Sequence, residues 1–322
     1  MMLDDDRRLL AKQGMLKTDV ARELYRKYYH VLFEVAKDLK NSNVREVRIT
    51  SDLVIITTAS EDVSLKCAEG EMTAALGQLS MAGAESEEQG ALVALTKELI
   101  AAKAGRNSGV VFFDIGANIG WYSIYLEKLF KGLQIHAFEP VAASYRLLLE
   151  NLVLNGTQDV RVNNFGLADA NKIVDYYVSP SLLAASSLAD TFKTDDKTRV
   201  RGEVRRLDDY CLANSIVPDL LKCDVEGAEL LVFKGAGRTL MEEKPAVMTE
   251  LLRKWAKFFN YHPNDVIKFF RDLGYSCYAL SNGMLVRFET VSDHTSEKNF
   301  FFLHDQKHAR IVRNLTMRMG SW

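Results

Sequence analysis

The stretch that decides the fold is VVFFDIGANIGWYS, residues Val110–Ser123. It begins with an apolar, β-prone run and continues into a turn that contains two glycines. The motif AFEP follows at Ala137–Pro140, and its Glu139 comes about two dozen residues after the turn. A strand, a glycine turn and a second strand that ends in a lone acid form the pattern with which parallel sheets bind nucleosides. The sequence therefore predicts an enzyme with a nucleoside-binding sheet.

Alternating strand and helix patterns continue from this motif toward the end of the chain. We predict strands at 110–114, 134–138, 160–165, 220–224, 246–250, 276–280 and 299–303. Helical stretches between most of these strands favour a doubly wound α/β sheet that helices cover on both faces. Residues 281–298 are loop-like, so the last two strands could form an antiparallel hairpin at one edge of the sheet.

The residues before the motif form an N-terminal extension. Apolar residues recur there every three or four positions and predict an amphipathic helix that ends near residues 41–43. They are Leu16, Val20, Leu24, Tyr28, Val31, Val35 and Leu39. Residues 44–67 predict two or three short antiparallel strands. The acidic, glycine-containing stretch between Asp52 and Glu98 is typical of a mobile connection or lid.

We place the boundary near residue 85, with an N-terminal extension at 1–84 and the main domain at 85–322. The apolar face of the first helix needs a partner surface. That surface is either its own domain or a second copy of the chain, which would make the helix a dimerisation arm. Sequence alone does not decide between them.

Composition describes an ordinary soluble globular protein, with 48% hydrophobic and 26% charged residues and a net charge of -2 over 322 residues. Lys193, Lys197, Arg199, Arg201, Arg205 and Arg206 form a local basic cluster. We interpret this cluster as a solvated loop and not as a nucleic-acid site. The four cysteines form no CxxC pair, which indicates reduced thiols in a cytoplasmic protein. We expect neither a signal peptide nor a membrane span.

The residues around the glycine turn indicate what it binds. Gly116 and Gly120 permit a positive φ or a close approach of the backbone to a ligand. Asp114 and Asn118 lie beside them, and an acid at that position repels a pyrophosphate and attracts a cation. Glu139 can accept hydrogen bonds from both hydroxyls of a ribose. Together these residues predict S-adenosylmethionine, whereas the spacing GANIG argues against a nicotinamide-dependent oxidoreductase.

Several motifs resemble those of the FkbM-type S-adenosylmethionine-dependent O-methyltransferases. They are DIGANIGWYS, FEP, LLLENLVLNG, SSL at Ser186–Leu188, RLDDY at Arg206–Tyr210, KCDVEGAELLVFKGA and GYSCYAL. The resemblance covers roughly residues 85 to 305. It implies a seven-stranded, Rossmann-like class I methyltransferase fold. It also implies methyl transfer to a hydroxyl group of a sugar, a polyketide or a similar small molecule.

The resemblance also implies roles for single residues. Cofactor contacts fall to Asp114, Gly116, Asn118 and Glu139, together with Asp224 at the end of the fourth strand. Adenine would lie near residues 164–166, although Asn164 and Gly166 could equally form only a strand end and a turn.

This sequence departs from the family pattern at one place. Members of the family often carry a histidine two residues after the glutamate of the fifth strand, but here Glu250 is followed by Leu251 and Leu252. The general base must then come from elsewhere, and our candidates are Asp224, Glu226, Glu250 and His262. Glu229 is better explained by a structural role at a helix N-terminus.

Two further alternatives stay open. Oxygen ligands suit Mg²⁺, which could bind at Asp224 and Glu250, but we favour Asp224 as a cofactor residue with no metal. The chain could also be a non-catalytic, cofactor-binding partner subunit, or a methyltransferase that acts on nucleic acid or protein. The acceptor that we favour is a small molecule or a sugar.

Overall fold

The computed structural model describes residues 5–6, 8–10, 14–70, 86–105, 109–157, 159–182, 185–191 and 196–318. Its centre is an eight-stranded sheet in the order β13–β12–β14–β11–β10–β4–β5–β6. The strands are β4 (Val111–Ile115), β5 (Gln134–Phe138), β6 (Arg161–Asn163), β10 (Leu220–Cys223), β11 (Ala246–Glu250), β12 (Tyr275–Ser281), β13 (Met284–Arg287) and β14 (Asn299–His304). Neighbours among β6, β5, β4, β10 and β11 pair in parallel, whereas β14 runs antiparallel between β11 and β12.

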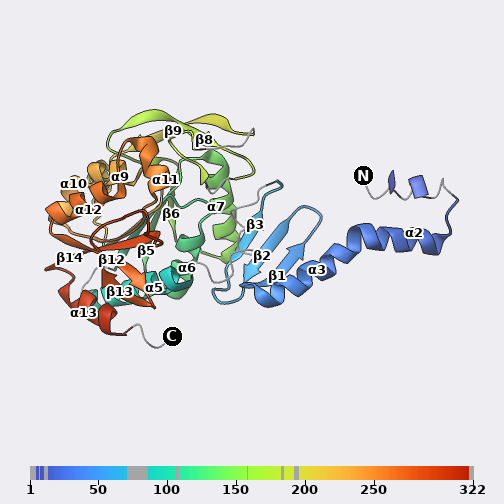
Figure 1. Cartoon of the computed structure of the whole chain (residues 1–322), viewed down its shortest axis with the longest axis horizontal. Helices are drawn as coiled ribbons and strands as arrows, with labels where there is room; N and C mark the ends of the chain where they lie inside the picture. The colour runs from blue at the N-terminus through green and yellow to red at the C-terminus, as the bar shows by residue number, and fades with distance from the viewer. Residues whose placement is uncertain are drawn as a thin grey trace.

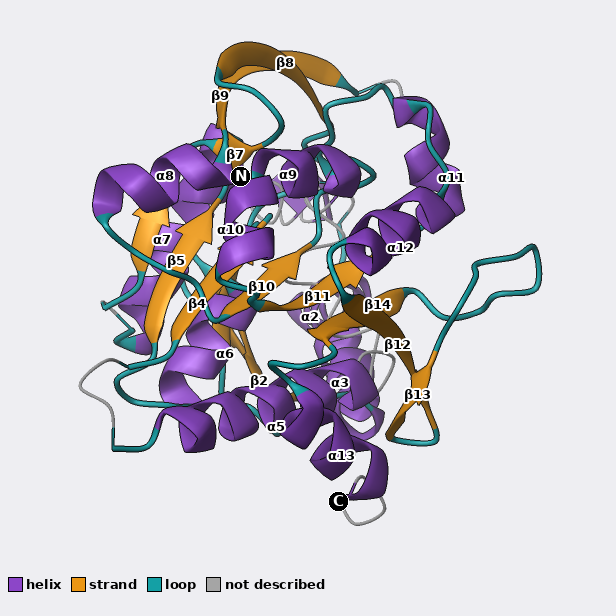
Figure 2. Ribbon diagram, turned by 90° about the vertical axis from the view of Figure 1, so that its left-hand side faces the viewer, coloured by secondary structure: helices purple, strands orange, loops and turns teal. Residues whose placement is uncertain are grey.

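Helices cover both faces of this sheet (Figure 2). One face carries α5 (Ser86–Lys103), α6 (Trp121–Leu129), α7 (Ala142–Asn155) and α13 (Ala309–Arg318). The other carries α8 (Leu207–Asn214), α9 (Glu229–Gly235), α10 (Gly237–Glu242) and α12 (Pro263–Asp272). The short helices α11 (Arg253–Ala256) and η4 (Lys257–Phe259) precede α12. Successive strand residues point to opposite faces, so Phe112 packs in the first layer and Phe113 in the second. This is the doubly wound α/β fold that the sequence predicts, and its strand order is that of a class I methyltransferase.

The far edge of the sheet differs from the prediction. The last two predicted strands, β12 and β14, do pair antiparallel, but they are not a terminal hairpin. β14 is inserted between β11 and β12, and the edge is a hairpin of β12 with β13. The residues of β13 fall within the segment 281–298 that the sequence predicts to be a loop. Three of the four side chains of β13 are exposed, so it carries little apolar signal.

A second sheet is absent from the prediction. It contains β7 (Gly166–Leu167), β9 (Thr198–Arg205) and β8 (Lys172–Val178), in that order. Most side chains of β8 and β9 are exposed or half-buried, and many are charged, so their sequence is typical of a solvated loop. In the structure these strands arch over one end of the central sheet (Figures 1 and 2).

The N-terminal helix and the strands that follow it are confirmed. A helical arm extends away from the body and comprises α2 (Lys17–Leu24), the π-helical turn η1 (Tyr25–Tyr29), α3 (His30–Asp38) and the 3-10 turn η2 (Leu39–Asn41) (Figure 1). The N-terminal sheet then follows with β1 (Val44–Ile49), β2 (Val54–Thr58) and β3 (Ser64–Cys67), which are antiparallel. Its Ile56 and Leu65 are fully buried and belong to the same core as α5, α6 and α7.

The predicted acidic lid needs a correction. Residues 71–85 lie outside the described part of the chain, and the predicted domain boundary near residue 85 stays a prediction. Residues 86–98, however, form the first part of α5, because Leu92 and Leu95 are buried in the core. No helix among the described residues is both long and apolar enough to cross a membrane.

Candidate active site

The glycine turn connects the end of β4 to the start of α6. Its backbone has positive φ angles at Gly116 (79°), Asn118 (48°) and Gly120 (91°). A Cβ atom on Gly116 would lie 1.8 Å from the carbonyl oxygen of Asp224, so only glycine fits there. The two predicted glycines therefore occupy conformations that side chains disfavour, and Gly116 brings the turn against the end of β10.

Glu139 stands at the end of β5, beside this turn. One carboxylate oxygen accepts a hydrogen bond from the backbone N–H of Asn118 at 2.9 Å, and the other from that of Val141 at 2.8 Å. Burial raises the pKa of Glu139 to about 7, although both backbone donors favour its ionised form. Each oxygen retains a lone pair that a ligand hydroxyl can use.

A cavity of about 280 Å³ opens where the parallel strands end. Its wall brings together seven of the predicted site residues: Gly116, Asn118, Glu139, Gly166, Asp224, Glu226 and Glu250. Ligands of open α/β sheets bind at this edge. Leu65 of β3 also lines the cavity, so the N-terminal sheet contributes to its wall.

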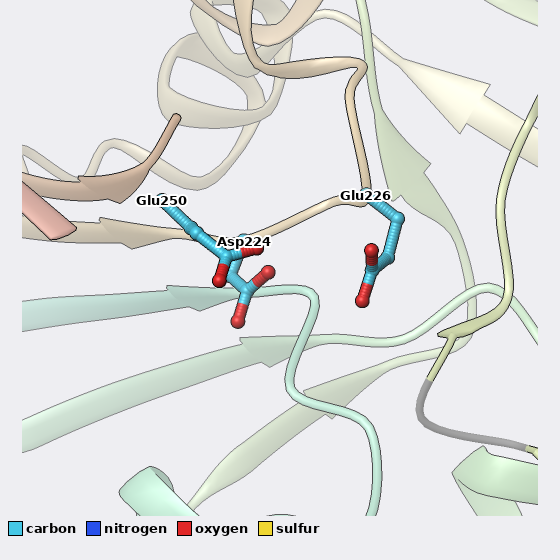
Figure 3. A group of neighbouring side chains, drawn as sticks. All are labelled: Asp224, Glu226 and Glu250. Atoms are coloured by element: carbon cyan, nitrogen blue, oxygen red, sulfur yellow. The ribbon is translucent and has the colours of Figure 1, made fainter. Parts of the chain in front are cut away.

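Three of these residues form the acid trio, which we define as Asp224, Glu226 and Glu250 (Figure 3). One carboxylate oxygen from each lies within 4.8 Å of the other two. Burial, together with the neighbouring negative charges, raises the pKa of Glu226 to about 8 and that of Glu250 to about 9. At neutral pH the trio therefore holds protons that isolated glutamates would release. Metal binding at Asp224 and Glu250 stays the alternative that we do not favour, since acid clusters also occur without an ion.

Lys222 is a site residue that the sequence-based prediction does not include. It is 6% exposed and lines the cavity two residues before Asp224. Its ammonium nitrogen lies 3.3 Å from the Asp224 carboxylate, 3.9 Å from that of Asp114 and 4.8 Å from the centre of the Tyr122 ring. Parallel pairing of β4 with β10 places Lys222 beside Asp114, so both point to the same face. The spacing of KCD is a usable signal for Lys222, because residues i and i+2 of a strand share a face.

Asp114 is fully buried and is not among the residues that line the cavity. One of its carboxylate oxygens accepts a hydrogen bond from the Ser123 hydroxyl at 2.7 Å. Burial raises its pKa, which the nearby Lys222 opposes. The predicted contact of Asp114 with a ligand's ammonium group thus stays a prediction, and the contacts seen here are with Ser123 and Lys222.

Three other predicted residues, Gly120, Asn164 and His262, are also not among the residues that line the cavity. The side-chain amide of Asn164 donates to the backbone oxygen of Glu139 at 2.9 Å, so Asn164 holds the strand end and turn together. His262 is not among the residues that line the cavity, and its proposed role as a base stays a prediction. Its ring caps α12 and accepts a hydrogen bond from the N–H of Asn264 at 3.2 Å.

Glu229 has the structural role that we expected. Its carboxylate accepts hydrogen bonds from the N–H groups of Val225 and Gly227 and from the Tyr261 hydroxyl. These bonds shape the loop that carries Glu226, which has a φ of 52°. Glu229 thereby helps to present one member of the acid trio.

Comparison with known proteins gives a consistent result. The model of the methyltransferase FkbM domain matches residues 114–277, about half of the chain. Methyltransferase 1 from Beauveria bassiana is 30% identical over 140 residues, which cover 38% of this chain and 56% of the relative. Methyltransferase sdnD from Sordaria araneosa is 32% identical over 153 residues, which cover 38% of this chain and 58% of the relative. The chain thus spans less than two thirds of the length of either relative.

Among solved structures, the chain is similar to the methyltransferase FkbM from Methylobacillus flagellatus. The two share 20% sequence identity with a TM-score of 0.39, and the match covers 60% of this chain and 43% of the other.

Proposed function

Since this chain belongs to the FkbM methyltransferase family, we propose that it moves a methyl group from S-adenosylmethionine to a hydroxyl group of a small molecule or a sugar. Membership makes the chain a methyltransferase and implies S-adenosylmethionine as the donor. When bound, this donor supplies a methyl group on a positively charged sulfur. The acceptor and the role of each acid are proposals that rest on the geometry of the cavity.

The cavity suits a nucleoside that carries an amino acid. Gly116 leaves room for a close approach to the backbone, and Glu139 offers acceptors for ribose hydroxyls. The Oδ1 atom of Asn118, which also lines the cavity, is buried and is one of the described side-chain atoms without a hydrogen-bond partner. Such an atom is costly to bury unless a ligand donates to it. We expect Asn118 and Glu139 to hold the donor.

One observation carries the proposal for the acceptor: the acid trio faces the same cavity as the glycine turn. An alcohol is a poor nucleophile until its proton leaves, so a hydroxyl acceptor needs a nearby base. Aligning acceptor and methyl group supplies roughly 7–11 kcal/mol, and a general base adds roughly 10²- to 10⁴-fold in rate. The trio can take that proton, and the raised pKa values of Glu226 and Glu250 suit transfer above neutral pH.

The test combines binding with turnover. Calorimetry should detect binding of S-adenosylhomocysteine to the protein. With labelled S-adenosylmethionine, the protein should methylate members of a panel of sugars and hydroxylated small molecules. Glu226→Gln and Glu250→Gln should still bind S-adenosylhomocysteine but should have a lower kcat. Replacement of the residue that acts as the base should lower kcat by roughly 10²- to 10⁴-fold. Glu289→Gln, an exposed glutamate outside the cavity, is the control. Methylation confined to amines or thiols would refute the hydroxyl proposal, and binding without any turnover would favour the non-catalytic subunit.

The described part of the basic cluster does not favour nucleic acid as the acceptor. Lys197, Arg199 and Arg205 form ion pairs with Asp190, Asp175 and Glu203. A cation that already forms an ion pair with a carboxylate gains less binding free energy from a phosphate group.

A further inference from the structure

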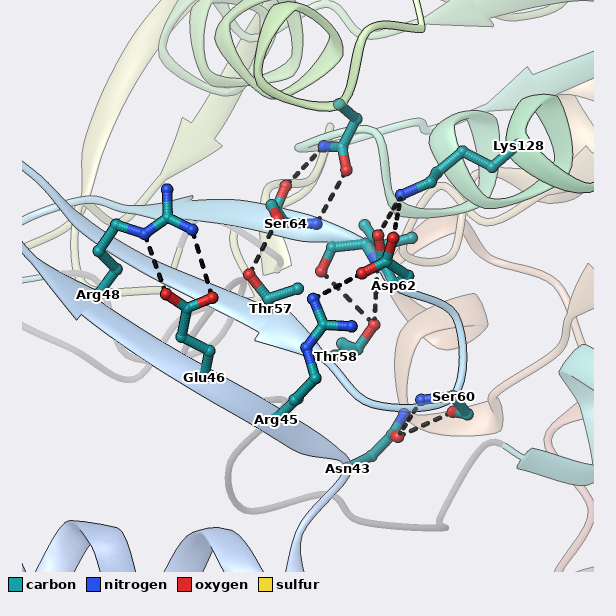
Figure 4. A network of polar contacts seen from close by, with 12 residues as sticks. Asn43, Arg45, Glu46, Arg48, Thr57, Thr58, Ser60, Asp62, Ser64 and Lys128 are labelled. Carbon is teal, nitrogen blue, oxygen red and sulfur yellow. Dashed lines mark hydrogen bonds and ion pairs between the residues drawn. The ribbon is translucent and has the colours of Figure 1, made fainter.

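The N-terminal sheet is attached to the methyltransferase core in an unusual way. One edge of β3 pairs with β2, and its other edge meets asparagine side chains of α7 where a further strand would lie. Ser64 exchanges two backbone hydrogen bonds with the Asn155 amide, at 2.9 and 2.7 Å. Figure 4 shows both bonds at Ser64, together with the Lys128 and Asp62 contact next to them. The asparagines thus cover an edge that would otherwise be open.

Asn151, one turn earlier on α7, makes a different pair of contacts. It is fully buried, and its amide oxygen accepts a hydrogen bond from the backbone N–H of Lys66 at 2.8 Å. Its amide nitrogen donates to the backbone oxygen of Ile119 at 2.9 Å. Ile119 belongs to the glycine turn. One side chain therefore joins β3 to the turn between Gly116 and Gly120.

The two segments that Asn151 joins both contribute to the wall of the cavity. Leu65 is fully buried and lines the cavity, as do Ile119 and Asn118. Strand geometry directs Leu65 to the face opposite Ser64 and Lys66, so the placement of β3 decides where the Leu65 side chain lies. The backbone of the glycine turn also positions the N–H of Asn118, which donates to Glu139.

We infer that Asn151 is a positioning residue for the methyl donor, because it holds the glycine turn and Leu65 of the N-terminal sheet against the same cavity. This inference rests on the proposed function, in which that cavity binds S-adenosylmethionine. The N-terminal sheet is accordingly part of the donor site. Asn155 attaches the same sheet to the same helix but makes no hydrogen bond to the turn, and it provides the matched control.

The first experiment compares Asn151→Ala with Asn155→Ala by calorimetry with S-adenosylhomocysteine and by thermal unfolding. Both variants lose hydrogen bonds to β3, so both should lower Tm. Asn151→Ala should also raise the Kd by roughly 10- to 100-fold, since small displacements of binding groups have effects of that size. Asn155→Ala should change the Kd less than about threefold. Equal Kd changes in the two variants would show that Asn151 is merely structural.

The second experiment separates the two contacts of Asn151 and covers the case in which Asn151→Ala does not fold. Lys66→Pro removes the N–H that donates to Asn151. Lys66→Ala keeps that N–H and removes only the ion pair with Glu150. A higher Kd for Lys66→Pro than for Lys66→Ala is expected, and equal values would overturn the inference. If the wild-type protein binds no S-adenosylhomocysteine, the proposed function fails as well; if it binds and the variants bind equally, only this inference fails.

Discussion

At the scale of single residues, Gly116 has the strictest steric requirement in the site. Its φ of 79° disfavours any side chain, and a Cβ atom there would lie only 1.8 Å from the Asp224 carbonyl oxygen. We expect Gly116→Ala to push the turn away from β10 and to abolish detectable binding of S-adenosylhomocysteine in calorimetry. Gly237→Ala is the control, because a Cβ there meets nothing within 4 Å. Binding by Gly116→Ala within about threefold of wild type would contradict this account.

A sequence motif predicts the backbone conformation of its residues better than it predicts their side-chain contacts. DIGANIG correctly indicates that Gly116 and Gly120 need positive φ angles, because that requirement is local. It does not reveal that the Asp114 side chain is buried against Ser123 and Lys222. That arrangement depends on β10, more than a hundred residues away in the chain. The partner of a buried charge is a tertiary property.

At the scale of elements, Asp208 caps a helix that is distant in sequence. Its carboxylate, on α8, accepts hydrogen bonds from the backbone N–H groups of Arg238 and Thr239 at the start of α10, and from the Thr239 hydroxyl. Asp208→Ala leaves buried donors unsatisfied, so we expect the free energy of unfolding to fall by about 1–3 kcal/mol. Urea unfolding measures this change. Asp209→Ala, which loses only an exposed contact with Asn171, should stay within about 0.5 kcal/mol of wild type.

Elements with a strong apolar signal can be predicted from the sequence, and those without one cannot. β5 and β11 match their predicted bounds, because their buried apolar residues stand out in the sequence. β8 and β9 are not predicted from the sequence, because their exposed faces carry charged residues such as Lys172 and Arg201. Their pairing in a separate sheet needs a partner strand, which local sequence does not specify.

At the scale of the whole molecule, the buried acids link stability to pH. Their pKa values are raised to about 7 in Glu139 and Glu229, about 8 in Glu226 and about 9 in Glu250. Above the ordinary glutamate pKa of about 4.3, these four acids bind more protons in the folded protein than in the unfolded chain, so their contribution to stability falls as pH rises from there through about 9. Urea unfolding of the ligand-free protein at several pH values should show this decline.

Glu250→Gln provides the check on that assignment. The substitution removes one of the protons that the folded state retains, so the variant should lose less stability than wild type between about pH 6 and 9. Glu289→Gln should follow the wild-type curve, because Glu289 is exposed. A wild-type stability that is constant or rises over this range would refute the link between burial of the acids and pH.

The helical arm is the other feature of the whole molecule that carries a prediction. Tyr25, Leu32 and Phe33 are 46%, 46% and 56% exposed in the described structure, although a helix with such a wide apolar surface is usually buried. Residues 17–29 hold four basic and two acidic residues, and residues 30–38 hold one basic and two acidic. Two antiparallel copies would bring these opposite charges together, so we expect a dimer. Sedimentation should show that Phe33→Glu is monomeric, whereas Phe258→Glu, at another exposed aromatic, stays dimeric.

By itself, the sequence determined the strand, glycine turn and helix at 110–129, the doubly wound sheet and the acid at the end of the second strand. These follow from local patterns, since apolar runs, positive-φ glycines and an acid at a strand end act over a few residues. Only the tertiary structure decided that Lys222 lies between Asp114 and Asp224, that His262 caps a helix away from the cavity, that Leu65 lines the cavity, and that Asn151 joins β3 to the glycine turn. Those facts depend on strand register and on the packing of segments far apart in the chain, which no local pattern encodes.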